Sequence, residues 1–324
     1  MKVFVSRKIP EIGYELLKNA GHEVTAWGDD RPLTQEELIQ YAKQHHGLIC
    51  MNGEKINSHF VNECRHLKVI SLYSVGYDNI DIAAATQLKI PVGNTPDVLS
   101  DATADIAFTL LLMASRKAIF QHKRILNKQW DFFRPTANLG IELKNKTLGV
   151  FGLGRIGFEM AKRCRGAYNM DIIYHNRSHN LQAEDELNAR MVSFDELLLQ
   201  SDVLSVHTAL TPETKGKFDY AAFSKMKKNC IFVNTARGGM HNEEDLIKAL
   251  NENLLWGAGL DVTNPEPMSP TNPLLSMPSV AVLPHIGSAT VEARNGMARI
   301  AAENAIAGLK GEHLPHPINP EVYK

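Results

Sequence analysis

The chain has 324 residues, more than one hydrophobic core usually supports, so its length favours two domains. A net charge of −1, with 22% charged residues and no dense basic block, argues against a nucleic-acid-binding surface. The sequence has no apolar run long enough to span a bilayer, no signal peptide and no Cys-x-x-Cys pair, and we therefore expect a cytoplasmic protein with four buried thiols.

Short apolar runs alternate with amphipathic segments along the whole chain. Strands are expected at residues 2–6, 22–26, 47–51, 69–72 and 90–93, with helices at 12–19 and 35–45, and a long helix begins near Asp101. The pattern restarts with strands at 147–151, 171–174, 203–207, 231–234, 257–262 and 280–284, and Ser193 and Glu196 form a capping box. A last helix is expected from Ala289 to Leu309, before Gly311. Such alternation predicts an α/β protein with parallel sheets.

The stretch Gly152-Leu-Gly154-Arg155-Ile156-Gly157 is a G-x-G-x-x-G motif that follows an apolar strand and opens a helix. Alone, the motif is weak. In this context its glycines can provide a tight turn, close backbone approach to a pyrophosphate, and tight packing of the helix. We therefore predict a dinucleotide site at Gly152, Gly154, Arg155, Ile156 and Gly157.

The residues after the second strand of this unit indicate which dinucleotide binds. His175 stands where NAD-binding folds usually carry an acid for the ribose hydroxyls, and Asn176, Arg177 and Ser178 follow it. A carboxylate would repel a 2′-phosphate, whereas Arg177 could pair with one and Ser178 could donate to it. We expect NADP(H) to be preferred, with NAD(H) possible; the alternative is that Arg177 is a solvated loop residue.

Three later segments each place a charged or titratable residue just beyond a strand, where ligands bind in open parallel sheets. They carry Arg237, Glu266 and His285. Reduction of a 2-keto acid needs a holder for the carboxylate and a proton donor. The Arg237 guanidinium can fork onto the carboxylate, and His285 can donate the proton while Glu266 bonds its other nitrogen. The residues expected to line the cofactor site beside them are Thr235, Ala236, Asp261, which would position the nicotinamide amide, and Gly287.

The order Arg237, Glu266, His285 after GLGRIG resembles the D-2-hydroxyacid dehydrogenase family, and the motifs NTPDVLSDATAD, GLDVTNPEP and LPHIGSATVEARNGM are most similar to its glyoxylate/hydroxypyruvate reductases, including 2-ketogluconate reductase-like members. The resemblance implies two doubly wound parallel-sheet domains, a Rossmann cofactor domain inserted in a flavodoxin-like substrate domain. The expected parts are residues 1–100 for substrate, residues 101–287 for the dinucleotide, and residues 288–324 returning to the substrate domain.

The same resemblance implies further contacts. The loop Ser74-Val75-Gly76 would meet the substrate carboxylate with backbone N–H groups, Thr103 would reach the cofactor phosphate, and the protein would be a homodimer built through the cofactor domain. NADP-linked members place an Arg and a hydroxyl just after the position of His175, as this chain does. The activity implied is reduction of a small 2-keto acid such as glyoxylate, hydroxypyruvate or 2-ketogluconate to the D-2-hydroxy acid, without nucleic acid, membrane or metal.

Alternatives remain open at this point. A nucleotide-sensing corepressor-like module would need the cofactor domain but no turnover, and a formate dehydrogenase-like enzyme would leave Glu266 idle. The aromatic segment of Trp130, Phe132 and Phe133 is expected to pack or to contact a second subunit; the alternative is that it forms a wall of the substrate site. Four histidines without a partner at metal-binding spacing are expected on the surface: His45, His46, His313 and His316.

Overall fold

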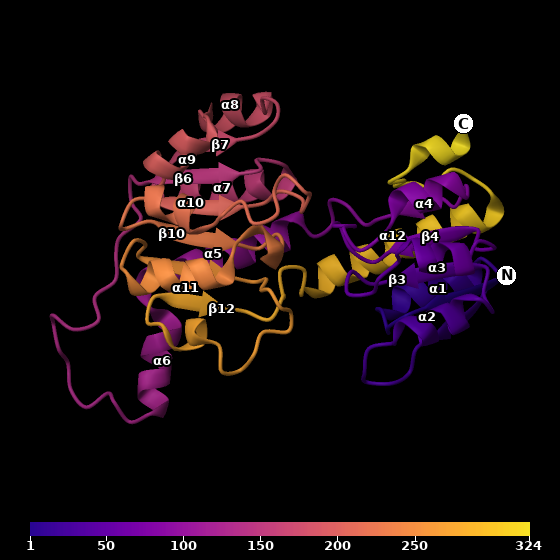
Figure 1. Ribbon diagram of the computed structural model, residues 1–324, viewed down its shortest axis with the longest axis horizontal. Coiled ribbons are helices and arrows are strands. Elements are labelled where there is room, and N and C mark those ends of the chain that lie inside the picture. The colour runs from indigo at the N-terminus through magenta and orange to yellow at the C-terminus, as the bar shows by residue number, and fades with distance from the viewer. The chain divides into compact units, whose positions relative to one another are not determined.

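The computed structural model describes all residues from 1 to 324, and they form two compact units. Unit 1 comprises residues 1–99 and 288–324, and unit 2 comprises residues 100–287 (Figure 1). The chain therefore leaves unit 1 once, builds unit 2 without interruption, and returns. No helix is long and apolar enough to cross a membrane.

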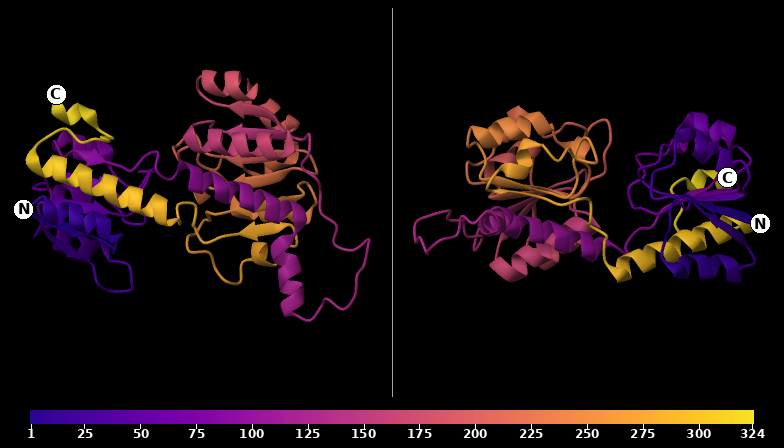
Figure 2. Two further views of the ribbon diagram at one scale, coloured as in Figure 1. Left: turned by 180° about the vertical axis from the view of Figure 1, so that it is seen from behind. Right: turned by 90° about the horizontal axis from the view of Figure 1, so that it is seen from below.

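Unit 1 is built on a five-stranded parallel sheet in the order β2-β1-β3-β4-β5. Helices α1 and α12 cover one face, and α2, α3 and α4 cover the other (Figure 2). This is the strand order of a flavodoxin-like doubly wound fold. The elements are β1 (Lys2–Val5), α1 (Glu11–Asn19), β2 (Glu23–Ala26), α2 (Gln35–Ala42), β3 (Gly47–Cys50), α3 (Ser58–Glu63), β4 (Val69–Leu72), α4 (Ile82–Gln87), β5 (Val92–Gly93), α12 (Val291–Lys310) and η3 (Pro320–Tyr323).

The last helix follows the apolar stripe read from the sequence. Met297, Ala301, Ala305 and Leu309 are all buried on α12, because four-residue spacing keeps them on one side of the helix. Gly311 ends the helix in the left-handed region at φ +77°, as expected of a C′ glycine.

Unit 2 is built on a seven-stranded parallel sheet in the order β12-β11-β10-β9-β6-β7-β8. Helices α5, α7 and α8 pack on one face, and α9, α10 and α11 on the other (Figure 2). The order reverses between β6 and β9, which is the place where doubly wound sheets bind ligands. The elements are α5 (Ser100–Arg116), α6 (Ala118–Leu126), β6 (Thr147–Phe151), α7 (Arg155–Tyr168), β7 (Asp171–His175), α8 (Leu181–Leu187), β8 (Arg190–Met191), α9 (Phe194–Gln200), β9 (Val203–Val206), α10 (Tyr220–Lys225), β10 (Ile231–Asn234), η1 (Gly238–Met240), α11 (Glu243–Asn251), β11 (Gly257–Leu260), η2 (Pro273–Ser276) and β12 (Val280–Val282).

The predicted fold class is confirmed, and the differences are local. The strand expected at 90–93 is paired only at Val92 and Gly93, because Pro91 has no N–H to offer the sheet. The two-residue edge strand β8 was not expected. The Ser193–Glu196 capping box is present and opens α9.

Two predictions about side-chain exposure need comment. All four cysteines are buried and free, as expected. The prediction for His45 was wrong: the expected helix ends at Ala42, and the His45 ring is buried against Phe4 with Nδ1 2.7 Å from the carbonyl oxygen of Tyr41. Packing against the sheet and a backbone hydrogen bond outweigh the polarity of the ring.

Candidate functional site

Three glycines shape the turn between β6 and α7. Gly152 has φ +94°, and a Cβ there would lie 2.7 Å from the Thr208 Cβ. A Cβ on Gly157 would lie 2.7 Å from the Gly152 carbonyl oxygen and 3.0 Å from a methyl of Val150. A Cβ on Gly154 would meet nothing within 4 Å. Gly152 thus makes the turn, Gly154 leaves space for a ligand to approach, and Gly157 allows tight packing of the helix. The N-terminus of α7, which begins at Arg155, is the kind of site that favours phosphate.

The glycine turn is held from the end of β7. The Oδ1 of Asn176 accepts from the Leu153 N–H at 2.7 Å, and its Nδ2 donates to the Leu153 carbonyl at 3.3 Å. Asn180 donates to the same carbonyl at 2.9 Å. His175 stacks on Phe151, with its Nδ1 3.0 Å from the Val192 carbonyl oxygen. Asn176, which we expected beside the cofactor, therefore uses its amide to fix the loop that would hold the cofactor.

Arg177 and Ser178 lie exposed just beyond β7. A hydrogen bond from Thr211 is the largest cause of the lowered pKa of Glu213, and the positive charge of Arg177 adds to it. Across the sheet, the Thr235 side chain is almost fully buried at the end of β10, and its Oγ1 has no partner in the protein. An open glycine cradle, an exposed guanidinium and an unsatisfied buried hydroxyl together fit a phosphate-bearing dinucleotide.

The acid–base pair expected from the sequence is formed within unit 2. His285, just after β12, has its Nδ1 2.5 Å from Oε1 of Glu266, and both side chains remain partly exposed. Partial burial would raise the pKa of Glu266, but the hydrogen bond and charge of His285 together hold it below its usual value. The pair leaves the Nε2 of His285 as the nitrogen for a substrate.

The segments that carry Arg237 and Glu266 touch through their backbones. A Cβ added to Gly238 would overlap the carbonyl oxygen of Thr263 and would lie 2.9 Å from the Asn264 nitrogen. Only a glycine permits this approach. Burial raises the pKa of Glu266 and His285 lowers it; the charge of Arg237 adds a smaller lowering. The structure thus brings Arg237, Glu266 and His285 to one edge of the sheet.

Asp261 takes a position that the sequence did not indicate. Its side chain is buried, with Oδ1 accepting from the Ile286 N–H at 2.8 Å and Oδ2 from the Gly287 N–H at 2.7 Å. Burial raises its pKa, and these two backbone bonds act against the rise. Asp261, which we expected to position the nicotinamide amide, holds the two residues that follow His285.

Comparison with known proteins agrees with this geometry. Residues 108–287 match the model of the D-isomer specific 2-hydroxyacid dehydrogenase, NAD binding domain. The glyoxylate reductase of Thermococcus litoralis is 41% identical over 99% of this chain and 97% of its own, and the human glyoxylate reductase/hydroxypyruvate reductase is 39% identical over 97% of each. A Sinorhizobium meliloti NADPH-dependent glyoxylate/hydroxypyruvate reductase, solved with NADP and malonate, is 28% identical over 99% of this chain and 97% of its own, with a TM-score of 0.85.

The chain belongs to the D-isomer specific 2-hydroxyacid dehydrogenase family. It is an oxidoreductase that reduces 2-keto acids with a nicotinamide dinucleotide.

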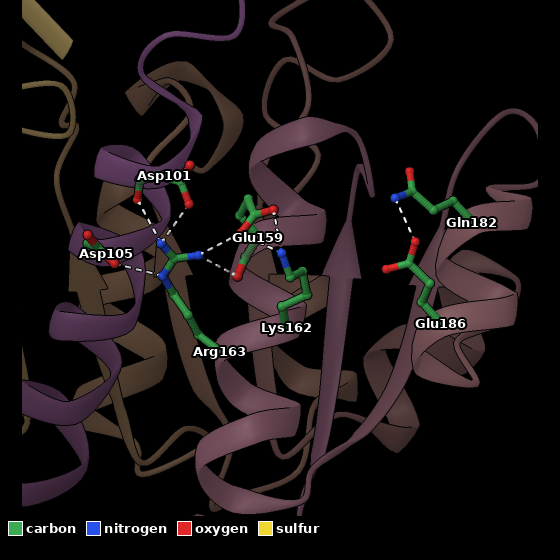
Figure 3. A network of polar contacts seen from close by, with 7 residues as sticks. All are labelled: Asp101, Asp105, Glu159, Lys162, Arg163, Gln182 and Glu186. Atoms are coloured by element: carbon green, nitrogen blue, oxygen red, sulfur yellow. Dashed lines mark hydrogen bonds and ion pairs between the residues drawn. The ribbon is translucent and has the colours of Figure 1, made fainter. Parts of the chain in front are cut away.

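In this 2-hydroxyacid dehydrogenase, a charged cluster fastens the first turns of α5 to α7 (Figure 3). Arg163 of α7 bonds Asp101 at 3.0 Å and Asp105 at 2.7 Å, and its own helix supplies Glu159 at 3.0 Å. Thr103 lies between the two aspartates in sequence, is buried, and packs against Gly287. The cluster therefore fixes the part of α5 that places Thr103 beside the loop after His285.

The loop Ser74-Val75-Gly76 lies in unit 1, directly after β4. It is fixed by its carbonyl oxygens: the Thr95 N–H donates to that of Ser74 at 3.0 Å, and the Asn94 side chain donates to that of Val75 at 2.8 Å. Holding the carbonyls presets the direction of the backbone without using the N–H groups that we expected to meet a carboxylate.

The aromatic segment before β6 is not packed into unit 2. Trp130 is 68% exposed, Phe132 61% and Phe133 82%, and the segment projects from the unit as the loop after α6 (Figure 2). Packing within the chain, one of the two expected outcomes, is therefore wrong for these side chains.

Sequence reasoning missed the residues that hold the site. Asn180 and Asn234 bond backbone atoms of the glycine turn and of the Arg237 segment, and Gly238 permits the contact with Thr263. The Gly238-Gly239 pair directly after Arg237 was a signal that backbone had to approach closely there. Nothing in the sequence pattern marked the two asparagines.

Proposed function

We propose that this chain is an NADPH-preferring reductase of glyoxylate and hydroxypyruvate, with 2-ketogluconate as a third candidate substrate, and that its product is the D-2-hydroxy acid. The observation that carries the proposal is the 2.5 Å pair of His285 and Glu266 at the sheet edge that also carries Arg237. Two relatives at about 40% identity match almost the whole chain, one named for glyoxylate and one for glyoxylate and hydroxypyruvate, which supports the substrate class.

The proposed chemistry divides among three side chains. Arg237 pairs with the substrate carboxylate and polarises the keto oxygen with its planar, two-point guanidinium. His285 transfers a proton from Nε2 to the C2 oxygen, and Glu266 holds the ring through its Nδ1. The reduced nicotinamide, when bound, supplies the hydride that C2 receives. Reduction thus consumes one hydride and one proton for each hydroxyl formed.

The cofactor preference is proposed from the end of β7. The position where an acid would hold both ribose hydroxyls of NAD is taken by His175, and Arg177 and Ser178 stand exposed just after it. The Sinorhizobium meliloti reductase, named as NADPH-dependent and solved with NADP, supports the same preference here. The proposed dinucleotide contacts are taken from those expected from the sequence: the glycine turn, Thr103, Thr235, Ala236 and Gly287. Asn176 and Asp261 were also expected there, and their side chains bond the backbone of the two loops that would hold the dinucleotide.

The carboxylate of the substrate is proposed to take further backbone N–H bonds from Ser74-Val75-Gly76. That role would make residues 1–99 and 288–324 the substrate-binding domain. Citrate, malonate or another carboxylate should compete with the 2-keto acid, since any carboxylate can accept from backbone N–H groups and pair with a guanidinium.

A homodimer is proposed through the aromatic segment of unit 2. The segment exposes three large aromatic rings within a few residues, which is costly in water unless another surface covers them. Sedimentation equilibrium at micromolar concentration should give twice the chain mass, and replacing Trp130 and Phe133 together by serine should give the monomer. A wild-type monomer would contradict this arrangement.

Steady-state kinetics test the proposed reaction. Glyoxylate, hydroxypyruvate and 2-ketogluconate are each supplied with NADPH and then with NADH, and oxidation of the cofactor is followed by absorbance. We expect turnover with at least one of the three acids and a higher kcat/KM with NADPH. Tight NADPH binding with no turnover of any of them would favour the corepressor-like binding module instead.

A further inference from the structure

His241 is a buried imidazole directly behind the Arg237 segment, and the proposed reaction does not use it. It follows η1, its side chain is 2% exposed, and its ring packs edge-on against Phe232 with centroids 5.7 Å apart. Its Nδ1 lies 3.1 Å from Nδ2 of Asn234, the last residue of β10.

Two backbone partners identify which atom of the Asn234 amide is the oxygen and which is the nitrogen. Its Oδ1 accepts from the Ala236 N–H at 3.0 Å, and its Nδ2 donates to the Arg237 carbonyl at 2.9 Å. Exchanging the two amide atoms would set donor against donor and acceptor against acceptor. The second hydrogen of Nδ2 therefore points to His241, whose Nδ1 has to accept it.

This requirement fixes the state of the His241 ring. With Nδ1 as acceptor, the ring is neutral and its hydrogen is on Nε2. Burial agrees, since it lowers the pKa of His241 to about 4. The Nε2 atom is buried and has no hydrogen-bond partner. An apolar side chain would remove that unsatisfied N–H but would leave the second hydrogen of the buried Asn234 Nδ2 without an acceptor, so a count of unpaired buried donors does not by itself account for a histidine here.

What the histidine gains is a fully satisfied Asn234 amide. With both hydrogens and the oxygen engaged, the amide cannot rotate, and its two backbone bonds flank Arg237 on either side: the N–H of the residue before it and its own carbonyl. A rotated amide would release both ends of the segment that carries the guanidinium. Asn234 is completely buried, so no water would replace the lost partner.

We propose that His241 is a positioning residue for Arg237: its neutral Nδ1 locks the Asn234 amide, and the amide sets the backbone on both sides of the guanidinium. The inference rests on the proposed function, in which Arg237 binds the 2-keto acid. His241 touches neither substrate nor cofactor in this arrangement.

Three variants separate the acceptor from the volume of the side chain. His241→Asn keeps an acceptor at the δ position, His241→Leu has nearly the same shape without one, and His241→Gln moves the acceptor one bond farther out. The measurements are kcat and KM for the 2-keto acid with NADPH, the Kd of NADPH without substrate, and the melting temperature.

We expect His241→Leu and His241→Gln to lose about tenfold to a hundredfold in kcat/KM, the usual effect of a misplaced catalytic group, with NADPH Kd near that of wild type. His241→Asn should stay within about threefold of wild type. Wild-type kcat/KM in both Leu and Gln variants would overturn the proposal, and so would an equal loss in all three. If His241→Leu does not fold, the Asn and Gln pair decides. A wild type inactive on every 2-keto acid would instead overturn the proposed function.

Discussion

Replacing Gly238 by alanine tests whether the contact between the Arg237 and Glu266 segments sets the catalytic geometry. The added Cβ would overlap the Thr263 carbonyl oxygen and lie 2.9 Å from the Asn264 nitrogen, and both neighbours are backbone atoms that cannot rotate away. The two segments would have to separate by roughly 1 Å, and a displacement of that size at a catalytic group costs on the order of a hundredfold in rate. We expect kcat/KM for the 2-keto acid to fall by about that factor.

Gly239→Ala is the matched control. A Cβ there would have as its nearest neighbours the two methyl ends of Leu210, at 3.3 and 3.5 Å, and that side chain can shift at little cost. Neither Gly238 nor Gly239 has a positive φ, so the two substitutions differ in packing and not in backbone strain. The assay is steady-state reduction at saturating NADPH, with circular dichroism to confirm folding. Near-normal turnover in a folded Gly238→Ala variant would refute the argument.

Three further predictions concern Arg177, Glu266 and the buried His207. Arg177→Ala should weaken NADPH by about tenfold to a hundredfold, the worth of a charge-assisted hydrogen bond, and leave NADH unchanged; equal losses in KM for both cofactors would contradict it. Glu266→Gln should move the pH profile of reduction to lower pH, because it removes the carboxylate charge in contact with the proposed proton donor; an unshifted profile would contradict the proposed pair. Burial lowers the pKa of His207 to about 3, so the unfolded chain takes up a proton near pH 6.5 and the folded chain does not. Stability is then lost as pH falls below 6.5, and between pH 7 and pH 5 His207 lowers the free energy of unfolding by about 2 kcal/mol. Urea unfolding at the two pH values should therefore show a smaller loss of stability in His207→Gln than in wild type.

The strands of both sheets could be predicted because buried parallel strands appear in the sequence as short, continuous apolar runs. Val69–Leu72 and Thr147–Phe151 were found with their observed ends. The errors fall where the hydrophobic pattern is too short to be informative. Strand β8 has only two residues, Arg190 and Met191, and the strand expected at 90–93 is two residues shorter because of Pro91. Hydrophobic periodicity could not have predicted either difference.

Whether the rings of the aromatic segment are buried within the chain or exposed on its surface could not be predicted from the sequence. Trp130, Phe132 and Phe133 have the composition of a core or of an interface, and the two differ only in what lies against them. The structure leaves these rings exposed within the chain, which removes one of those readings. A hydrophobic pattern indicates that a surface will be covered, but it does not name the partner.

Arg237, Glu266 and His285 could be proposed from the sequence because each is charged or titratable and follows a strand, whereas the residues that position them form bonds set by the fold. Asp261 shows the difference: it also follows a strand, yet its carboxylate accepts hydrogen bonds from the backbone after His285. That backbone needs support, since His285 has φ +53°, a backbone conformation that residues other than glycine rarely adopt. Burial of Asp261 acts against its charged form, and its two bonds to Ile286 and Gly287 offset part of that cost while holding the strained turn. A short sequence motif can indicate which side chain is a candidate to react. The buried neighbour that holds that side chain in place is not identified by any spacing rule.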